Sequence, residues 1–131
     1  MISRKFINAL NTITVISVLM ILFDYLYLSS FSKHFSKVFK SIQGSEMKVK
    51  LLSAAGVYIL MVFTVYYFGF VRKLSEIDMG LLGALIYGIY EWTNHATIDA
   101  WPYWMIALDT VWGGLLFFMV ASSTKIILSR I

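Results

Sequence analysis

Residues 51–71 read LLSAAGVYILMVFTVYYFGFV, a run without a single charged side chain. About 20 consecutive helical residues are enough to cross the hydrocarbon core of a bilayer. Half-buried strands alternate apolar and polar residues, and this run does not alternate. Inside lipid the backbone must satisfy its own hydrogen bonds, which only helices and closed barrels achieve. The run therefore predicts a transmembrane helix over residues 51–72.

Three further apolar runs lie on either side of this one, and each also predicts a helix. They cover residues 6–31, 79–95 and 102–125. The run at 79–95 is the shortest, and it spans a bilayer only if Glu91, Asn94 and His95 continue its helix inside a bundle. A re-entrant segment is the alternative there. The sequence predicts one all-α domain over residues 1–131, an integral membrane four-helix bundle.

The overall composition supports a membrane protein. Apolar residues make up 60% of the chain and charged residues 14%, whereas an ordinary soluble domain has roughly 45–50% and 25%. So much apolar surface excludes a disordered chain, and 131 residues have too little interior to hide it in a soluble monomer. The absence of cysteine excludes disulfides, thiolate chemistry and cysteine-bound metals. The net charge of +4 comes mostly from residues that flank apolar runs, which favours lipid headgroups over nucleic acid as the partner.

A basic segment, residues 32–44, follows the first apolar run. Its lysines Lys33, Lys37 and Lys40 lie mostly off one helical face, which is formed by apolar residues. These are Phe31, Phe35, Val38, Phe39 and Ile42. A basic amphipathic helix with aromatic residues typically lies along the headgroups. We therefore predict an interfacial helix that ends at Gly44, with a solvated loop as the alternative.

Three acids fall within or at the end of the apolar runs, namely Asp24, Glu91 and Asp109. No lysine or arginine lies inside those runs, since Lys125 stands at the very end of the last one. A carboxylate in a spanning helix costs several kcal/mol, so it faces a bundle interior, a water cavity or a partner. Alternating spans bring the ends of the first and third runs and the start of the fourth to one side of the membrane. We therefore predict a polar cluster near one membrane face. Its predicted members are Asp24, Glu91, Thr93, Asn94, Asp109 and Trp112.

The most polar stretch inside the apolar region is residues 90–102, YEWTNHATIDAWP. His95 and Asp99 are four residues apart and could share a helical face, but two ligands are too few for a typical zinc site. The sequence therefore predicts no metal and no cofactor. Aromatic side chains gather near the predicted helix ends, where an interfacial belt is expected. They are Tyr27, Tyr90, Trp92, Trp101, Tyr103 and Trp104.

Two motifs in this region resemble a known family. The first, G-x-x-x-Y-x-x-Y-[DE]-x-T-N-x-A-T-x-x-x-W-P, begins at Gly83 and ends at Pro102, and the second, D-x-x-W-G, begins at Asp109. Both are similar to motifs of the membrane-protein family called domain of unknown function 2177, which has members in bacteria and large DNA viruses. A family element resembling D-x-x-W-L falls on Asp24, where Tyr27 replaces the tryptophan; Glu91 replaces the more usual aspartate. The resemblance implies a small four-helix integral membrane protein in a bacterial inner membrane, or in a host or virion membrane if the chain is viral. It implies no activity.

Three functions remain open from the sequence. The carboxylate cluster binds or passes a proton, a cation or a small basic solute, in which case so small a chain is expected to act as a homo-oligomer or within a larger membrane complex. Alternatively, the acids are protonated and join helices by hydrogen bonds in a structural or accessory subunit. The third and least favoured function is a small lipid-modifying enzyme with Glu91 or Asp109 as general base, assisted by His95.

Overall fold

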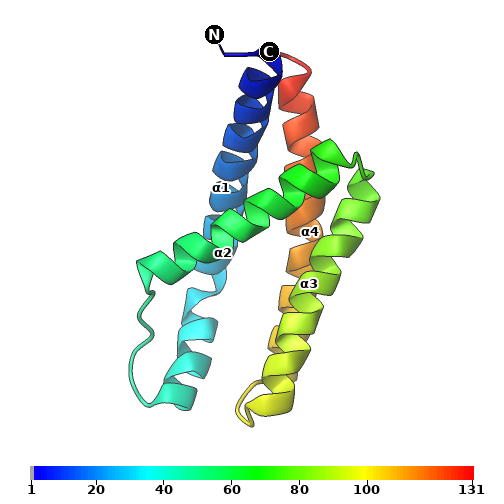
Figure 1. The fold of residues 1–131 in the computed structure, drawn as a ribbon. Coiled ribbons are helices and arrows are strands. Elements are labelled where there is room, and N and C mark those ends of the chain that lie inside the picture. Colours follow the sequence, from blue (N-terminus) through cyan, green and yellow to red (C-terminus); the bar gives the residue numbers. More distant parts are fainter. Residues whose placement is uncertain (1) are drawn as a thin grey trace.

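A computed structural model describes residues 2–131 as a bundle of helices (Figure 1). The helices are α1 (Arg4–Gln43), α2 (Leu51–Thr64), the π-helical continuation of α2, η1 (Val65–Val71), α3 (Glu76–Thr97) and α4 (Tyr103–Leu128). There is no strand among these described residues, so the predicted all-helical fold is confirmed. Three of the helices are long and apolar enough to cross a membrane: α1, α2 together with η1, and α4.

The helices differ in direction. In Figure 1, α1, α3 and α4 run along the long axis of the molecule, whereas α2 crosses it obliquely. Both chain ends lie at one end of the molecule, and the turn between α3 and α4 lies at the other. This arrangement agrees with the alternating direction expected of successive spans.

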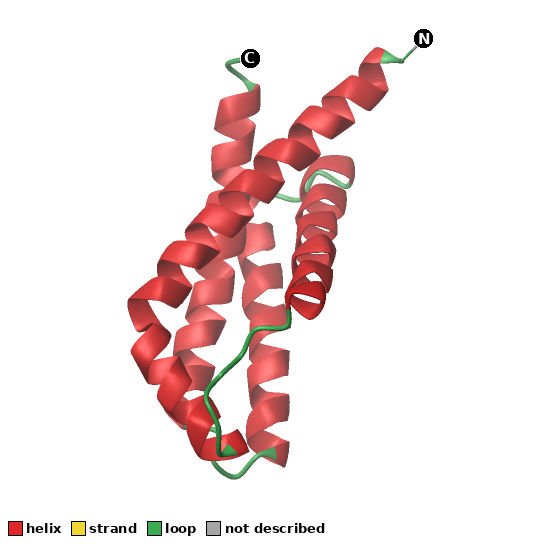
Figure 2. Cartoon of the chain, turned by 90° about the vertical axis from the view of Figure 1, so that its left-hand side faces the viewer, coloured by secondary structure: helices red, strands yellow, loops and turns green. Residues whose placement is uncertain are grey.

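The first helix is longer than the sequence suggested. We expected a helix over 6–31 and a separate interfacial one over 32–44, but α1 continues unbroken for 40 residues, about 60 Å at 1.5 Å per residue. Figure 2 shows that it changes direction before its C-terminal end. Gly44 ends it, as predicted, with a φ of 73° and its N–H donating to the carbonyl oxygen of Lys40 at 2.9 Å. Glycine adopts this left-handed conformation without steric cost.

The apolar face of residues 32–43 packs inside the protein. Phe35 and Tyr27 form a buried cluster with Trp101, Met105 and Ile106 from the start of α4 and the loop before it. The helical periodicity of this segment was therefore interpreted correctly. Its partner was not, because the aromatic face covers α4, and only the opposite, lysine-bearing face is free to meet headgroups.

The third helix passes through its polar residues. α3 runs for 22 residues, about 33 Å, and includes Glu91, Asn94 and His95. Its first turn is capped by Ser75, whose hydroxyl oxygen accepts from the N–H of Asp78 at 3.1 Å. The segment is thus one continuous helix, as long as a bilayer core is thick.

Close packing of α3 on α4 positions the acids of both helices. Gly83 and Gly113 face each other, and a Cβ added at either would overlap the backbone of the other helix. Small residues at such a crossing let two helix backbones approach closely. Because α3 and α4 are antiparallel, the same seam continues toward Glu91 on α3 and Asp109 on α4. The side chain of Lys125 joins the helices near the opposite end, 3.4 Å from a carboxylate oxygen of Glu76.

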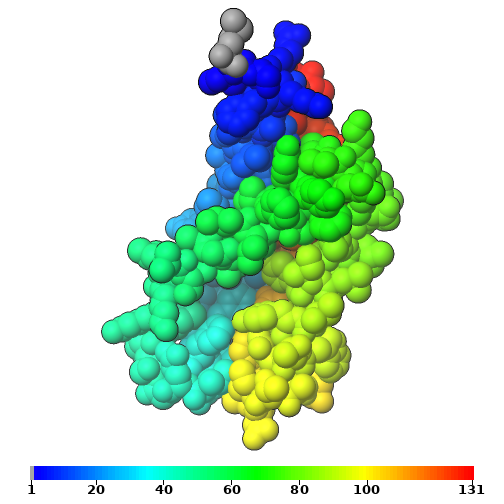
Figure 3. All heavy atoms as spheres, in the orientation of Figure 1, coloured from blue at the N-terminus to red at the C-terminus, as the bar shows by residue number. Residues whose placement is uncertain are grey.

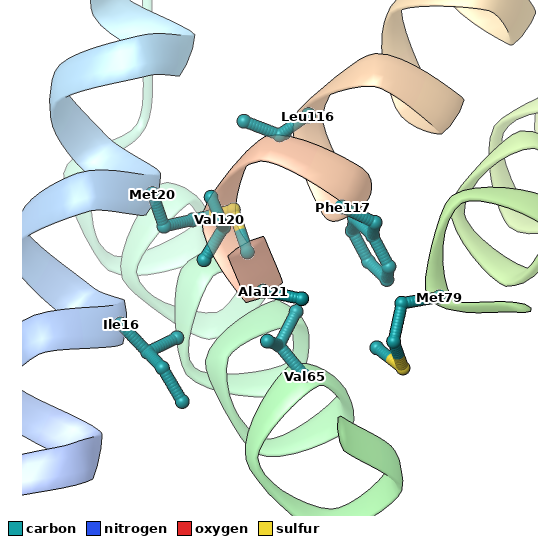
Figure 4. Packing of buried hydrophobic residues seen from close by; sticks show 8 residues of the cluster. All are labelled: Ile16, Met20, Val65, Met79, Leu116, Phe117, Val120 and Ala121. Carbon is teal, nitrogen blue, oxygen red and sulfur yellow. The ribbon is translucent and has the colours of Figure 1, made fainter. Parts of the chain in front are cut away.

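The apolar core lies where η1 meets the other helices. Figure 4 shows its buried side chains converging from α1, η1, α3 and α4. They are Ile16, Met20, Val65, Met79, Leu116, Phe117, Val120 and Ala121. In contrast, α2 has no buried residue between Leu51 and Thr64. Leu51 and Leu52 are 82% and 89% exposed, and such a continuous apolar surface is suited to lipid rather than water.

Candidate functional site: an acidic pocket between three helices

All three predicted acids line one pocket of about 450 Å³. Asp24 comes from α1, Glu91 from α3 and Asp109 from α4. Figure 3 shows a hollow below α2, between the end of α1 and α3, with atoms of α1 and α4 at its bottom. The rest of the wall is mainly aromatic and apolar. It includes Tyr25, Tyr27, Leu28, Phe35, Phe39, Met47, Val49, Tyr87, Tyr90, Trp101 and Met105.

Asp24 is held by two helices other than its own. It is buried on α1, where the indole N–H of Trp112 from α4 donates to its Oδ1 at 3.0 Å. The hydroxyl of Tyr58 from α2 donates to its Oδ2. These two bonds satisfy both carboxyl oxygens and connect α1 to α2 and α4.

Glu91 and Asp109 form the other half of the acidic wall. Glu91 is 1% exposed and its Oε2 accepts from the indole N–H of Trp101 at 2.6 Å. Asp109 lines the same pocket, and its carboxyl group accepts from the hydroxyl of Tyr27. Two negative charges that line one low-dielectric pocket repel each other, and a proton or a cation in the pocket relieves that repulsion.

The pocket has acidic side chains in its wall and no basic partner for them. Its lining contains no lysine, arginine or histidine, and all of its lining residues are among those that the structure describes. The four groups that donate to the acids are tyrosine hydroxyls and tryptophan N–H groups, which are neutral. They orient the carboxyl groups and leave any negative charge in place, so the pocket is suited to a positively charged ligand.

Of the other predicted members of the cluster, one contacts an acid and two do not. Trp112 contacts Asp24, as described above. Thr93 is exposed and its hydroxyl donates to the backbone oxygen of Ile89 at 2.6 Å. Asn94 does not line the pocket either, although its backbone oxygen accepts from the N–H of Ile98 at 2.8 Å. Both residues therefore belong to the end of α3 and not to the acidic wall.

Three aromatic residues belong to the site and were not predicted there. Tyr27 and Trp101, which we expected in an interfacial belt, are only 8% and 3% exposed and donate to acids. The spacing of Tyr27, three residues after Asp24, was a usable signal, since i and i+3 share a helical face. Tyr58 gave no signal, because a tyrosine in an uncharged run can as well lie at a headgroup. By contrast Tyr103 stays 69% exposed.

His95 closes the connection between α3 and α4. Its Nδ1 lies 2.7 Å from the carbonyl oxygen of Trp101, so this nitrogen carries the proton and donates. Its ring lies against Tyr103, with 4.2 Å between the ring centroids. Among the described residues, no three acid or histidine side chains lie close enough together to hold one metal ion. The three pocket acids are thus spread over the wall and do not converge on one point.

Comparison with known proteins gives one match. A family model described as "predicted membrane protein (DUF2177)" matches residues 9–126, which include every residue of the acidic pocket. No curated protein matches the chain, and no solved structure does.

Proposed function

The chain belongs to the DUF2177 family of predicted membrane proteins, and on that premise we propose that it is a membrane-embedded binding protein for a small cation, either a proton or a protonated amine. The observation that carries the proposal is that carboxyl groups from α1, α3 and α4 line one pocket that has no basic residue in its wall. Burying acids is costly, and a cationic ligand offsets that cost.

The size and the wall of the pocket favour an organic cation. Pockets for small molecules typically measure about 300–1,000 Å³, and this one measures about 450 Å³. Aromatic faces attract cations, with up to about 2 kcal/mol per contact in a desolvated site. Tyr27, Phe35 and Tyr87 supply such faces beside the acids. An ammonium group can therefore contact both a carboxylate and a ring.

A structural role is the alternative, and the hydrogen bonds of Asp24 and Asp109 favour it. Tyr58 to Asp24, Trp112 to Asp24 and Tyr27 to Asp109 all cross between helices, as expected of acids that hold a bundle together. This role does not explain why Glu91 and Asp109 line the same pocket, since each already binds an aromatic donor of its own. The enzymatic alternative loses its assisting base, because His95 bonds to Trp101 and does not line the pocket.

Binding of tetramethylammonium tests the proposal. The ion is titrated into detergent-solubilised protein, and tryptophan fluorescence reports on Trp101 and Trp112, which contact two of the acids. We expect saturable binding that Asp109→Asn weakens about 10–100-fold, because losing one carboxylate charge beside a bound cation in a partly buried site costs on the order of 1.4–2.7 kcal/mol. Proton flux into dye-loaded proteoliposomes, measured with the same variants, tests the proton as the ligand.

Asp99→Asn is the matched control, because Asp99 is exposed in the loop after α3 and does not line the pocket. It should bind and conduct like the unmodified protein. If Asp109→Asn changes neither tetramethylammonium binding nor proton flux, the pocket is not a cation site and the structural role stands.

We further propose that α3 is the fourth span, since it is about 33 Å long and lies along α4. The chain would then be a multi-pass protein of a bacterial inner membrane, or of a host or virion membrane if it is viral. Moving a ligand across the bilayer would require several copies or a larger complex, because one small bundle provides a site but no second gate.

A further inference from the structure

A second charged region lies outside the acidic pocket, on the C-terminal part of α1. Lys33, Lys37 and Lys40 form a lysine face: they are spaced by four and three residues and all are exposed. The opposite side of the same turns is fixed against the start of α4, where the ring of Phe35 stacks on Trp104 with 6.0 Å between centroids. Phe39 packs on Trp101 at 5.7 Å. The lysines therefore project outward from a rigidly docked helix.

Two shallow hollows adjoin this lysine face. One of about 390 Å³ is lined by Lys33, His34, Ser36, Lys37, Lys40 and Glu46. Another of about 320 Å³ is lined by His34, Lys37, Val38, Ser41 and Trp104. Lys37 and His34 are common to both. A polar hollow with ammonium groups and a hydroxyl thus lies beside one that a tryptophan and a valine make partly apolar.

The charge of the lysine face is mostly unbalanced. Among the described residues, Glu46 is the one acid in an ion pair with this face, 3.0 Å from Nζ of Lys40. Lysines three and four residues apart on a helix repel each other, so an anion bound between Lys33 and Lys37 would relieve that repulsion. A phosphate group supplies the charge and the acceptor oxygens that ammonium and hydroxyl donors require.

The position of the face identifies the source of the phosphate. The C-terminal part of α1 lies at the same end of the molecule as the α3–α4 turn, away from both chain ends (Figure 1). Exposed Tyr103 and Trp104 begin α4 at that end, and such residues typically mark the boundary between hydrocarbon and headgroups. Lysines at this level meet the phosphates of the adjacent leaflet.

We infer that the lysine face binds an anionic phospholipid. The phosphate lies in the hollow of Lys33, Ser36 and Lys37, and the glycerol and upper acyl chains lie against Trp104. The site is separate from the acidic pocket, which faces the other side of α1, and it does not depend on the cation proposal. The lipid stabilises the docking of α1 on α4, because it neutralises the one face of these turns that is not packed.

Thermal unfolding in a neutral detergent tests the inference, with short-chain phosphatidylglycerol as the probe. We expect phosphatidylglycerol to raise the unfolding temperature in a saturable way and phosphatidylcholine to leave it unchanged. Changing all three lysines to glutamine should weaken the apparent affinity on the order of 100-fold, from three surface charges lost near one phosphate. The lysine-to-arginine triple variant keeps the charges and should retain the effect.

The matched control removes three positive charges from the other end of the molecule, with Arg4, Lys5 and Arg130 changed to glutamine. This variant should respond to phosphatidylglycerol like the unmodified chain. An equal response in the glutamine variant of the lysine face, or an equal effect of phosphatidylcholine, would overturn the inference. Stabilisation by inorganic phosphate at the same concentration would likewise overturn it, since a free anion and not a lipid would then be the ligand.

Discussion

We expect Gly83→Ala to lower the free energy of unfolding of the protein markedly. A Cβ at this position would overlap the carbonyl oxygen of Gly113 and lie 2.6 Å from Cγ of Phe117. Backbone atoms of a packed helix cannot rotate away as a flexible side chain can, so α3 and α4 must separate along their seam. Overpacking of this kind costs about 1–3 kcal/mol, and we expect the upper end, measured by denaturant unfolding in detergent.

Gly56→Ala is the control for the same chemical change. Gly56 lies in α2, and a Cβ there would meet nothing within 4 Å. Alanine is favoured over glycine in a helix by roughly 1 kcal/mol, so this variant should be slightly stabilised. If both variants shift in the same direction by similar amounts, the seam is not as tight as described, and helix propensity alone would explain both.

Asp24→Leu is the second substitution with a large expected effect. The substitution removes the acceptor of both the Trp112 N–H and the Tyr58 hydroxyl. A buried donor without a partner costs about 1–3 kcal/mol, so we expect a loss of about 2–5 kcal/mol in the free energy of unfolding. Asp24→Asn keeps one acceptor oxygen and should lose less than half as much.

A set of combined variants separates the hydrogen bonds from the burial of the acid. Tyr58→Phe and Trp112→Phe remove the donors, and combining both with Asp24→Leu leaves no unpaired group. The triple variant should therefore be more stable than Asp24→Leu alone, which is the sign of direct coupling. Tyr67→Phe changes a tyrosine without such a bond and should have no effect. If the losses in stability of the three single variants simply add up in the triple variant, the hydrogen bonds from Tyr58 and Trp112 to Asp24 contribute nothing to stability.

The sequence predicted the helices well, because each helix is determined mainly by a pattern of residues that are close together in the sequence. The uncharged run at 51–71, the capping residue Ser75 and the stop at Gly44 act on the backbone nearby. The predicted helix boundary between residues 31 and 32 was wrong, because it was also placed from a local pattern, the change in composition. A change from apolar to basic composition changes what surrounds a helix, and it does not by itself end one.

The site was predictable only where burial cost gave a signal. An acid in an apolar run must face a polar interior, and this alone identifies Asp24, Glu91 and Asp109 from the sequence. Tryptophan and tyrosine carry no such signal, because their amphipathic rings suit both an interface and a buried bond. Trp101 and Tyr58 are therefore identified by three-dimensional packing alone. Thr93 and Asn94 were predicted in the cluster because they are polar and close to Glu91 in the sequence. Neither lines the pocket, so closeness in sequence was misleading there.

Because α2 has few contacts with the other helices, we expect it to be the first helix to unfold locally. Resistance to local unfolding follows the buried contacts of a segment. Residues 51–64 have no buried residue and only two side-chain hydrogen bonds to other helices, from Tyr58 to Asp24 and from Tyr87 to the sulfur of Met61. Amide protons in α2 should therefore exchange with solvent deuterium well before those of α3 and α4. α2 crosses the upper edge of the acidic hollow (Figure 3). Movement of α2 away from the bundle is therefore the opening that we expect to need the least free energy when a ligand enters the pocket.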